Sequence, residues 1–167
     1  MPVATVYTAD GQGRPWKAEA TISVVGNAAG GSKPTVSANN VQGHMGNAHP
    51  YHHERGHLIG KQLGGDGSDA RNLVGLSDGT NAPLMTDIEN ECRQIIQDNG
   101  PGASVYLHVE VDYSNTYYNA PVGANYTLGM VGRIIVTIYS DYTKQFLLFQ
   151  RAYPNGVVKN HYTAGCC

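Results

Sequence analysis

The chain has 167 residues, of which 41% are apolar and 14% charged, and its formal net charge is −2 at pH 7. This length suits one domain with a hydrophobic core of its own, so we expect a single domain over residues 1–167. The near-neutral charge excludes a uniformly basic nucleic-acid-binding domain, and no apolar run approaches the roughly eighteen residues of a membrane span. The first ten residues also lack the basic start and apolar run of a signal peptide.

The first half of the chain is predicted to hold short strands and one long loop. Residues 5–10 (TVYTAD) and 17–25 (KAEATISVV) have the composition of strands, and 71–77 (RNLVGLS) is a short apolar run typical of a brief strand. Residues 26–50 contain GNAAGGSKP and NNVQGHMGNAHP and show little patterning, which predicts a long surface loop. The 21 glycines and 11 tyrosines of the chain also favour strands and turns over a helical bundle.

One main helix is predicted from Thr80 to about residue 98. Its apolar residues recur at helical spacing: Leu84, Ile88, Cys92, Ile95 and Ile96. Pro83 is expected in the first turn, where a missing N–H costs nothing, and NGPG at 99–102 ends the helix.

The second half of the chain is predicted to form further strands. Residues 104–113 alternate, with Val105, Leu107, Val109 and Val111 on one face, as in a half-buried strand. A connection rich in tyrosine and asparagine leads to strands at 129–140 and 144–153, and a turn follows at YPNG, 153–156. The fold class is therefore α+β, with a mixed or antiparallel sheet and one main helix.

The three cysteines leave several possibilities open. Cys166 and Cys167 are adjacent, and neighbouring residues seldom reach disulfide geometry with each other. Three states of Cys92 fit the sequence: a disulfide to Cys166 or Cys167, one ligand of a zinc site, or a free thiol, and the spacing of the cysteines does not distinguish them.

Residues 52–57 read HHERGH, and His53-Glu54-x-x-His57 satisfies the H-E-x-x-H pattern of zinc proteases. That pattern needs both histidines on one face of a helix. Pro50 and Gly56 oppose a helix here, and a leucine stands where the elongated motif has its third histidine. A zinc metalloprotease remains as an alternative function.

Three segments together carry a resemblance to a known family: ERGHLIGKQLGG at 54–65, RNLVGLSDGTNAP at 71–83 and DIENECRQII at 87–96. They resemble the DNA/RNA non-specific endonucleases, the ββα-metal nucleases whose hallmark is D-R-G-H. The resemblance spans about half the chain, beginning at GRPWKAEATI, 13–22. In that family the motif histidine is followed by two asparagines nine residues apart and a glutamate eight residues further on, and Asn72, Asn81 and Glu89 match this series.

The resemblance implies a Mg²⁺-dependent, sequence-nonspecific endonuclease with a ββα-metal core embedded in the domain. It would cut DNA, with RNA left open as a second substrate, and Mn²⁺ could replace Mg²⁺. By resemblance, His57 is the general base, Asn81 the metal ligand, and Glu89 the residue that holds the metal's waters. Arg55 would pair with the phosphate, and Asn72 would position substrate or the histidine. These roles fit the chemistry, because phosphodiester hydrolysis needs a base for water and cations for the developing charge.

Two positions depart from the family pattern. Glu54 replaces the usual aspartate, and we assign it no direct role. The family's arginine about thirty residues before the histidine is missing, and Lys17 or Lys33 is the candidate replacement. The other histidines match nothing in the pattern and are expected on the surface or in loops: His44, His49, His52, His53, His108 and His161.

The resemblance leaves the biological setting open. The chain could be a free secreted nuclease, or the payload of a bacterial toxin that is delivered to another cell and is bound by a small immunity protein. A catalytically dead relative that only binds nucleic acid is a further alternative, although the intact His57 and Asn81 oppose it.

Overall fold

Five antiparallel strands form the main sheet in the computed structural model, which describes residues 5–119 and 126–159. In spatial order they are β1 (Val6–Ala9), β2 (Pro15–Ile22), β5 (Val105–Asp112), β6 (Arg133–Tyr139) and β7 (Leu147–Pro154). The predicted alternation of residues 104–113 is confirmed in β5, whose Val105, Leu107, Val109 and Val111 are all buried. The sheet therefore presents one apolar face on which a second layer can pack.

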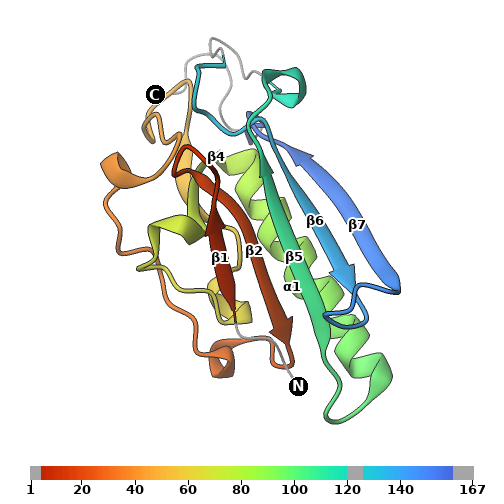
Figure 1. The fold of residues 1–167 in the computed structure, drawn as a ribbon. Coiled ribbons are helices and arrows are strands. Elements are labelled where there is room, and N and C mark those ends of the chain that lie inside the picture. Colours follow the sequence, from red (N-terminus) through yellow and green to blue (C-terminus); the bar gives the residue numbers. More distant parts are fainter. Residues whose placement is uncertain (1–4, 120–125, 160–167) are drawn as a thin grey trace.

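The second layer contains a strand–strand–helix unit. β3 (His53–His57) and β4 (Leu73–Ser77) pair antiparallel as a separate two-stranded sheet, and the chain passes directly from β4 into helix α1 (Asp78–Asn99). Figure 1 shows α1 running along one face of the five-stranded sheet. Its buried residues Leu84, Ile88 and Cys92 join the apolar faces of β2, β5 and β6 in one hydrophobic core. The α+β class with antiparallel sheets and a single main helix is thus confirmed.

Helix α1 starts earlier than the sequence predicts. It begins at Asp78 rather than Thr80, so Pro83 is the sixth helical residue and not part of the first turn. Asp78 favours the earlier start because an acidic side chain is stabilised near the positive end of the helix dipole. Pro83 therefore removes an N–H that would otherwise bond to the carbonyl of Gly79. The predicted end is correct, since Gly100 follows the last helical residue.

The segment 26–50, expected to be a surface loop, is packed against the chain that follows β3. Its backbone donates hydrogen bonds to residues 62–67: Gly26 to Gln62, Ser32 to Gly65 and Thr35 to Gly67. Short 3-10 turns punctuate this region at Asn27–Ala29, Ala38–Asn40, Lys61–Leu63 and Ala70–Asn72, and a fifth lies at Asn115–Tyr117. The loop-rich part of the chain consequently covers one side of β3.

Two histidines expected at the surface are buried. His52 is 2% exposed and His53 only 1%, because β3 begins beneath residues 44–51 and the ring of His53 packs against those of His44 and Tyr51. Cys92 is buried in the helix–sheet core, whereas Cys166, Cys167 and His161 lie outside the described residues. Within 5–119 and 126–159, no helix has the length and apolar character needed to cross a membrane.

Candidate active site

The alternating side chains of β3 divide the site residues between its two faces. On one face, Glu54 Oε1 accepts a hydrogen bond from Asn81 Nδ2 at 3.1 Å. Gly56 faces the same way: a methyl group on its α-carbon would stand 3.0 Å from Asn81 Oδ1. On the other face, Arg55 and His57 contact the backbone of the 26–50 segment. The structure therefore brings Asn81 to Glu54, and places His57 on the opposite side of the strand.

The amide oxygen of Asn81 has no partner of its own. Asn81 Nδ2 is held by Glu54, so the amide is oriented, yet Oδ1 is buried and accepts no hydrogen bond from any described residue. A buried acceptor without a partner carries a desolvation cost, and such atoms commonly mark a ligand position. An ion that takes oxygen ligands would satisfy this atom.

Glu89 lies two turns further along α1, about 12 Å from Asn81 along the helix axis. Positions 81 and 89 differ by about 80° around a helix axis, so both can face one space. Glu89 Oε1 would stand 3.9 Å from a methyl group placed on Gly60, three residues after His57. Burial raises the pKa of Glu89 above its usual value, and the positive charge of Arg93 opposes that rise. A nearby cation would favour the ionised form that burial disfavours.

The donors on this side are carboxylate and amide oxygens, which suit a hard, hydrated ion such as Mg²⁺. They do not suit structural zinc: among the described residues, no three histidine, cysteine, aspartate or glutamate side chains gather around one point. The zinc-protease reading also needs a helix, but residues 53–57 form β3. His53 and His57 are consequently about 13 Å apart along an extended strand, too far to share one ion.

His57 is held in one tautomer by the chain backbone. Its imidazole is 9% exposed and Nε2 lies 3.0 Å from the carbonyl oxygen of Ser32. Since a carbonyl can only accept, Nε2 carries the proton and Nδ1 keeps its lone pair. Burial lowers the pKa of His57 below 6.5, against the opposing influences of the Ser32 carbonyl and of Asp66. The residue is therefore neutral near pH 7 and able to accept a proton.

The edge of β3 that does not pair with β4 is mostly free of backbone hydrogen bonds among the described residues. His53 N–H donates to Gly46, away from β4. Gly75 of β4, which stands opposite Arg55, donates its N–H to Gln42, away from β3. The odd-numbered residues of β3 therefore direct their backbone groups away from β4. Beyond His53, no described backbone group pairs with that edge of the strand. The backbone groups of Arg55 and His57 thus lie on an unpaired edge, and their side chains lie on the face of β3 opposite to Asn81.

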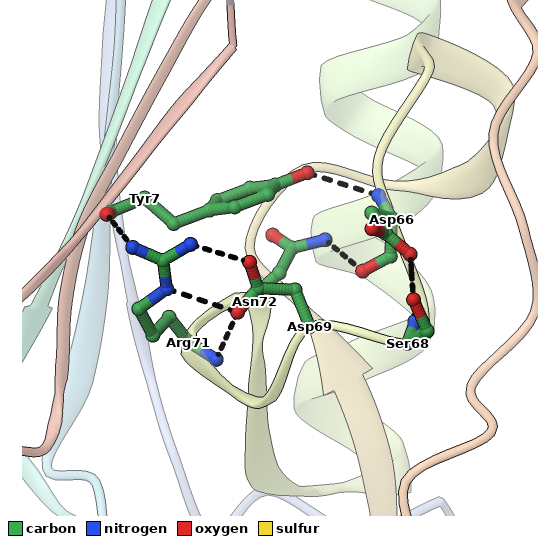
Figure 2. Close-up of polar contacts among 6 residues, drawn as sticks. All are labelled: Tyr7, Asp66, Ser68, Asp69, Arg71 and Asn72. Atoms are coloured by element: carbon green, nitrogen blue, oxygen red, sulfur yellow. Dashed lines mark hydrogen bonds and ion pairs between the residues drawn. The ribbon is translucent and has the colours of Figure 1, made fainter.

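Asn72 is fully buried, and its side chain fastens the segment that follows His57. Its Oδ1 accepts from Ile59 N–H at 2.8 Å, and its Nδ2 donates to the carbonyls of Ile59 at 3.0 Å and Asp66 at 3.2 Å. The last of these bonds is drawn in Figure 2. All three bonds go to backbone atoms, so the geometry makes Asn72 a residue that positions the chain two residues after His57.

The loop that carries Asn72 is anchored to the five-stranded sheet through side chains that the sequence did not single out. Figure 2 shows Asp66 N–H donating to the hydroxyl of Tyr7 in β1 at 2.9 Å, while Arg71 donates to the backbone oxygen of Tyr7 at 3.0 Å. Arg71 also pairs with Asp69 at 2.7 Å, and Ser68 Oγ donates to Asp66 at 2.6 Å. This loop therefore has a fixed position relative to the sheet.

More than half of the positive charges of the protein are paired with carboxylates, and four of the others are close to site residues in the sequence. Of the 11 lysines and arginines, six form ion pairs with carboxylates: Arg14, Lys17, Arg71, Arg133, Lys144 and Arg151. Lys33 follows Ser32, Arg55 precedes His57, Lys61 follows Gly60, and Arg93 lies one turn after Glu89. Of the two lysines considered as replacements for the missing arginine, Lys17 pairs with Glu110 at 3.7 Å, whereas Lys33 has no carboxylate partner among the described residues.

Strand alternation could have predicted that Glu54 and Gly56 share the face opposite to His57, the face that Asn81 contacts in the structure. No comparable sequence signal marks Ser32. Its contribution is a backbone carbonyl, which every residue possesses.

Comparisons with known proteins agree with this geometry. A family model described as DNA/RNA non-specific endonuclease matches residues 3–131. The crystal structure of NucA from Streptococcus agalactiae with no metal bound shares 18% identity, with a TM-score of 0.58 over 93% of this chain and 72% of that one. The structure of NucA from the same organism with a magnesium ion bound shares 18% identity, with a TM-score of 0.59 over 94% of this chain and 73% of that one. A structure named extracellular nuclease shares 14% identity, with a TM-score of 0.50 over 92% of this chain and 86% of that one. No curated protein sequence matches the chain. At these identities the structural likeness establishes the fold.

Proposed function

We propose, on the premise that the chain belongs to the DNA/RNA non-specific endonuclease family, that it cuts DNA in a Mg²⁺-dependent reaction without regard to sequence. Family membership makes the chain a hydrolytic nuclease with nucleic acid as its substrate. The observation that carries the finer proposal is the buried, unpartnered Oδ1 of Asn81, oriented by Glu54 and accompanied by the carboxylate of Glu89. RNA is proposed as a second substrate, and residues 1–167 as a single nuclease domain.

The residues present fit a hydrated divalent cation. Asn81 Oδ1 would be its direct protein ligand, and the carboxylates of Glu54 and Glu89 would accept hydrogen bonds from its waters. When bound, such an ion neutralises negative charge that develops on the phosphate and on the leaving oxygen. The magnesium in one of the two NucA structures supports this assignment, and Mn²⁺, which also accepts oxygen ligands, is proposed to substitute.

His57 is proposed to act as the general base. Its Nδ1 takes a proton from a water molecule while the water oxygen forms a bond to phosphorus. The bond from phosphorus to the 3′-oxygen breaks, and that oxygen leaves with the electron pair and is protonated by water, so the products carry a 5′-phosphate and a 3′-hydroxyl. The bond from Nε2–H to Ser32 supports this role, because it fixes the ring with Nδ1 free and stabilises the imidazolium that forms.

Arg55 is proposed to bind the phosphate that lies at the unpaired edge of β3. Its guanidinium now donates to the carbonyls of Val36 at 3.0 Å and Pro34 at 3.4 Å, and a phosphate would be a stronger acceptor than either. Contacts of this kind read the backbone and not the bases, which accounts for cutting without sequence preference. Export from the producing cell is proposed as well, in line with the structural neighbour named as an extracellular nuclease.

Cleavage of supercoiled plasmid tests the proposal directly. The wild type should nick and linearise plasmid in Mg²⁺ and stop when EDTA is added. His57→Ala and Asn81→Ala should each lower the rate by about 10²–10⁴-fold. His108→Ala is a matched control, because His108 pairs with Glu19 on the main sheet, away from β3. Intact plasmid after incubation with the wild type and Mg²⁺, or full activity in both site variants, would end the proposal. The products should be ligatable without kinase treatment, as 5′-phosphate ends are.

A further inference from the structure

Asn155, immediately after β7, joins three parts of the fold through its side chain. The residue is 0% exposed. Its Oδ1 accepts from the backbone N–H of Ser77 at 2.9 Å and lies 3.3 Å from the Ser77 hydroxyl oxygen. Its Nδ2 donates to the carbonyl of Val131 at 3.0 Å and to that of Gly75 at 3.3 Å. One buried amide thus connects the end of β4 with the approach to β6.

The same contacts continue into the first turn of α1. The hydroxyl of Ser77 donates to Thr80 Oγ1 at 3.0 Å and accepts from Gly156 N–H at 3.0 Å. The Thr80 hydroxyl in turn donates to the carbonyl of Pro154 at 2.8 Å. Residues 154–156 therefore hold both the last residue of β4 and the first turn of the helix.

The start of α1 lacks the usual local support. Ser77 stands at the N-cap, a position from which a serine hydroxyl commonly accepts a hydrogen bond from the helix backbone, yet its side chain makes no such bond. The hydroxyl donates to Thr80 instead and accepts from Gly156 N–H. The direction in which the helix leaves β4 is thus set by a residue 78 positions later in the chain.

We propose that Asn155 is a positioning residue for the metal site, and that it acts by fixing the junction from which Asn81 projects. Asn81 follows Ser77 by four residues, about one helical turn. Glu54, its hydrogen-bond partner, lies on β3, which is registered against the same strand, β4. A change in the angle between β4 and α1 would therefore move the amide of Asn81 relative to Glu54. This inference rests on the proposed role of Asn81 as metal ligand.

The chemistry of an amide explains why this position holds asparagine. The site needs an acceptor for the Ser77 N–H and donors for two carbonyls, Gly75 and Val131, all in a buried place. Aspartate has the same shape but no donor, and its charge would face two carbonyl oxygens. Alanine leaves all of these backbone groups without a partner. Asn155 also lies beyond residue 131, where the match to the family model ends.

A comparison of Asn155→Ala with Val136→Ala separates positioning from plain stability. Val136 is a 0% exposed residue of β6 and takes no part in the junction contacts, so its truncation destabilises the core alone. Both proteins are assayed well below their melting temperatures. We expect Asn155→Ala to need about tenfold more Mg²⁺ for half-maximal rate and to lose kcat, with KM for DNA within about twofold of wild type. Val136→Ala should lower the melting temperature and keep the wild-type Mg²⁺ dependence.

Hydrogen–deuterium exchange gives a readout independent of catalysis. Asn155→Ala should speed exchange in peptides that cover 77–82 and leave those of β5 unchanged. Should Asn155→Ala not fold, Thr80→Val removes the link to Pro154 and Thr80→Ser restores it, so the first should shift the Mg²⁺ dependence and the second should not. An unchanged Mg²⁺ dependence with unchanged exchange at 77–82, or an equal Mg²⁺ shift in Val136→Ala, would overturn the inference. Wild-type activity that needs no Mg²⁺ would instead refute the proposed function, and the exchange result would still decide whether Asn155 holds the junction.

Discussion

Replacing Gly56 by alanine should damage the site through one methyl group. The added carbon would stand 2.6 Å from Leu76 Cδ1 and 3.0 Å from Asn81 Oδ1. Carbon atoms in contact ordinarily lie about 3.5–4.0 Å apart, so the overlap with Leu76 is close to 1 Å. Overpacking of this size costs about 1–3 kcal/mol in the free energy of unfolding. For a chain of this length that corresponds to a fall of about 2–12 °C in melting temperature.

The same methyl group presses on the oxygen proposed to bind the metal. We therefore expect Gly56→Ala to raise the Mg²⁺ concentration for half-maximal plasmid cleavage by about tenfold or more, beyond its effect on stability. Calorimetry and initial-rate titrations with Mg²⁺ measure the two effects separately. Gly11→Ala is the matched control, since a methyl group there would meet nothing within 4 Å. A Gly56→Ala protein with the melting temperature and Mg²⁺ dependence of the wild type would show that Gly56 does not face Asn81.

Three further tests address single groups of the site. Burial lowers the pKa of His57, so the proposed base stays neutral in mild acid. The inflection on the acid side of the kcat/KM profile should therefore lie below pH 6.5. An inflection above that value would contradict the burial of the ring. Glu54→Gln keeps the size of the side chain but removes its charge, so it should raise the Mg²⁺ concentration for half-maximal cleavage about tenfold. The pH profile of the cleavage rate, which reports on His57, should stay as in the wild type. Burial lowers the pKa of His53 to about 4, with the neighbouring His44 adding to the shift. The folded state thus binds fewer protons than the unfolded state between pH 4 and 6.5, so the contribution of His53 to stability is full above pH 6.5 and is lost as the pH falls through 4. In urea unfolding over that range, the free energy of unfolding of His53→Asn should fall by about 3 kcal/mol less than that of the wild type.

Local patterns were sufficient to predict most of the secondary structure. The spacing of Leu84, Ile88 and Cys92 predicted the helix, and strict alternation predicted β5, because in each case the side chains that face the core repeat with the period of the backbone. The start of α1 was wrong by two residues. Asp78 was a local signal for the earlier start, whereas the bond from Ser77 to Asn155 joins residues too far apart to leave a trace in the nearby sequence.

The sequence likewise predicted some parts of the candidate site and not others. The order and spacing of Asn72, Asn81 and Glu89 after His57 identified the family, which the family model confirms. The 26–50 segment has no periodicity, and its contacts with Arg55 and His57 come from backbone carbonyls, so its packing against β3 could not be predicted.

With most of its lysines and arginines paired with carboxylates, this enzyme has few unpaired cations that could bind the phosphates of long DNA. Each phosphate that a protein neutralises on B-DNA contributes about −0.9 to the slope of log affinity against log salt, so phosphate contacts from Lys33, Arg55, Lys61 and Arg93 would give a slope of about −3.6. Few displaced counterions correspond to a weak electrostatic hold on the polymer between cuts. We therefore expect distributive digestion, in which long DNA accumulates scattered nicks from separate encounters and does not shorten from one end.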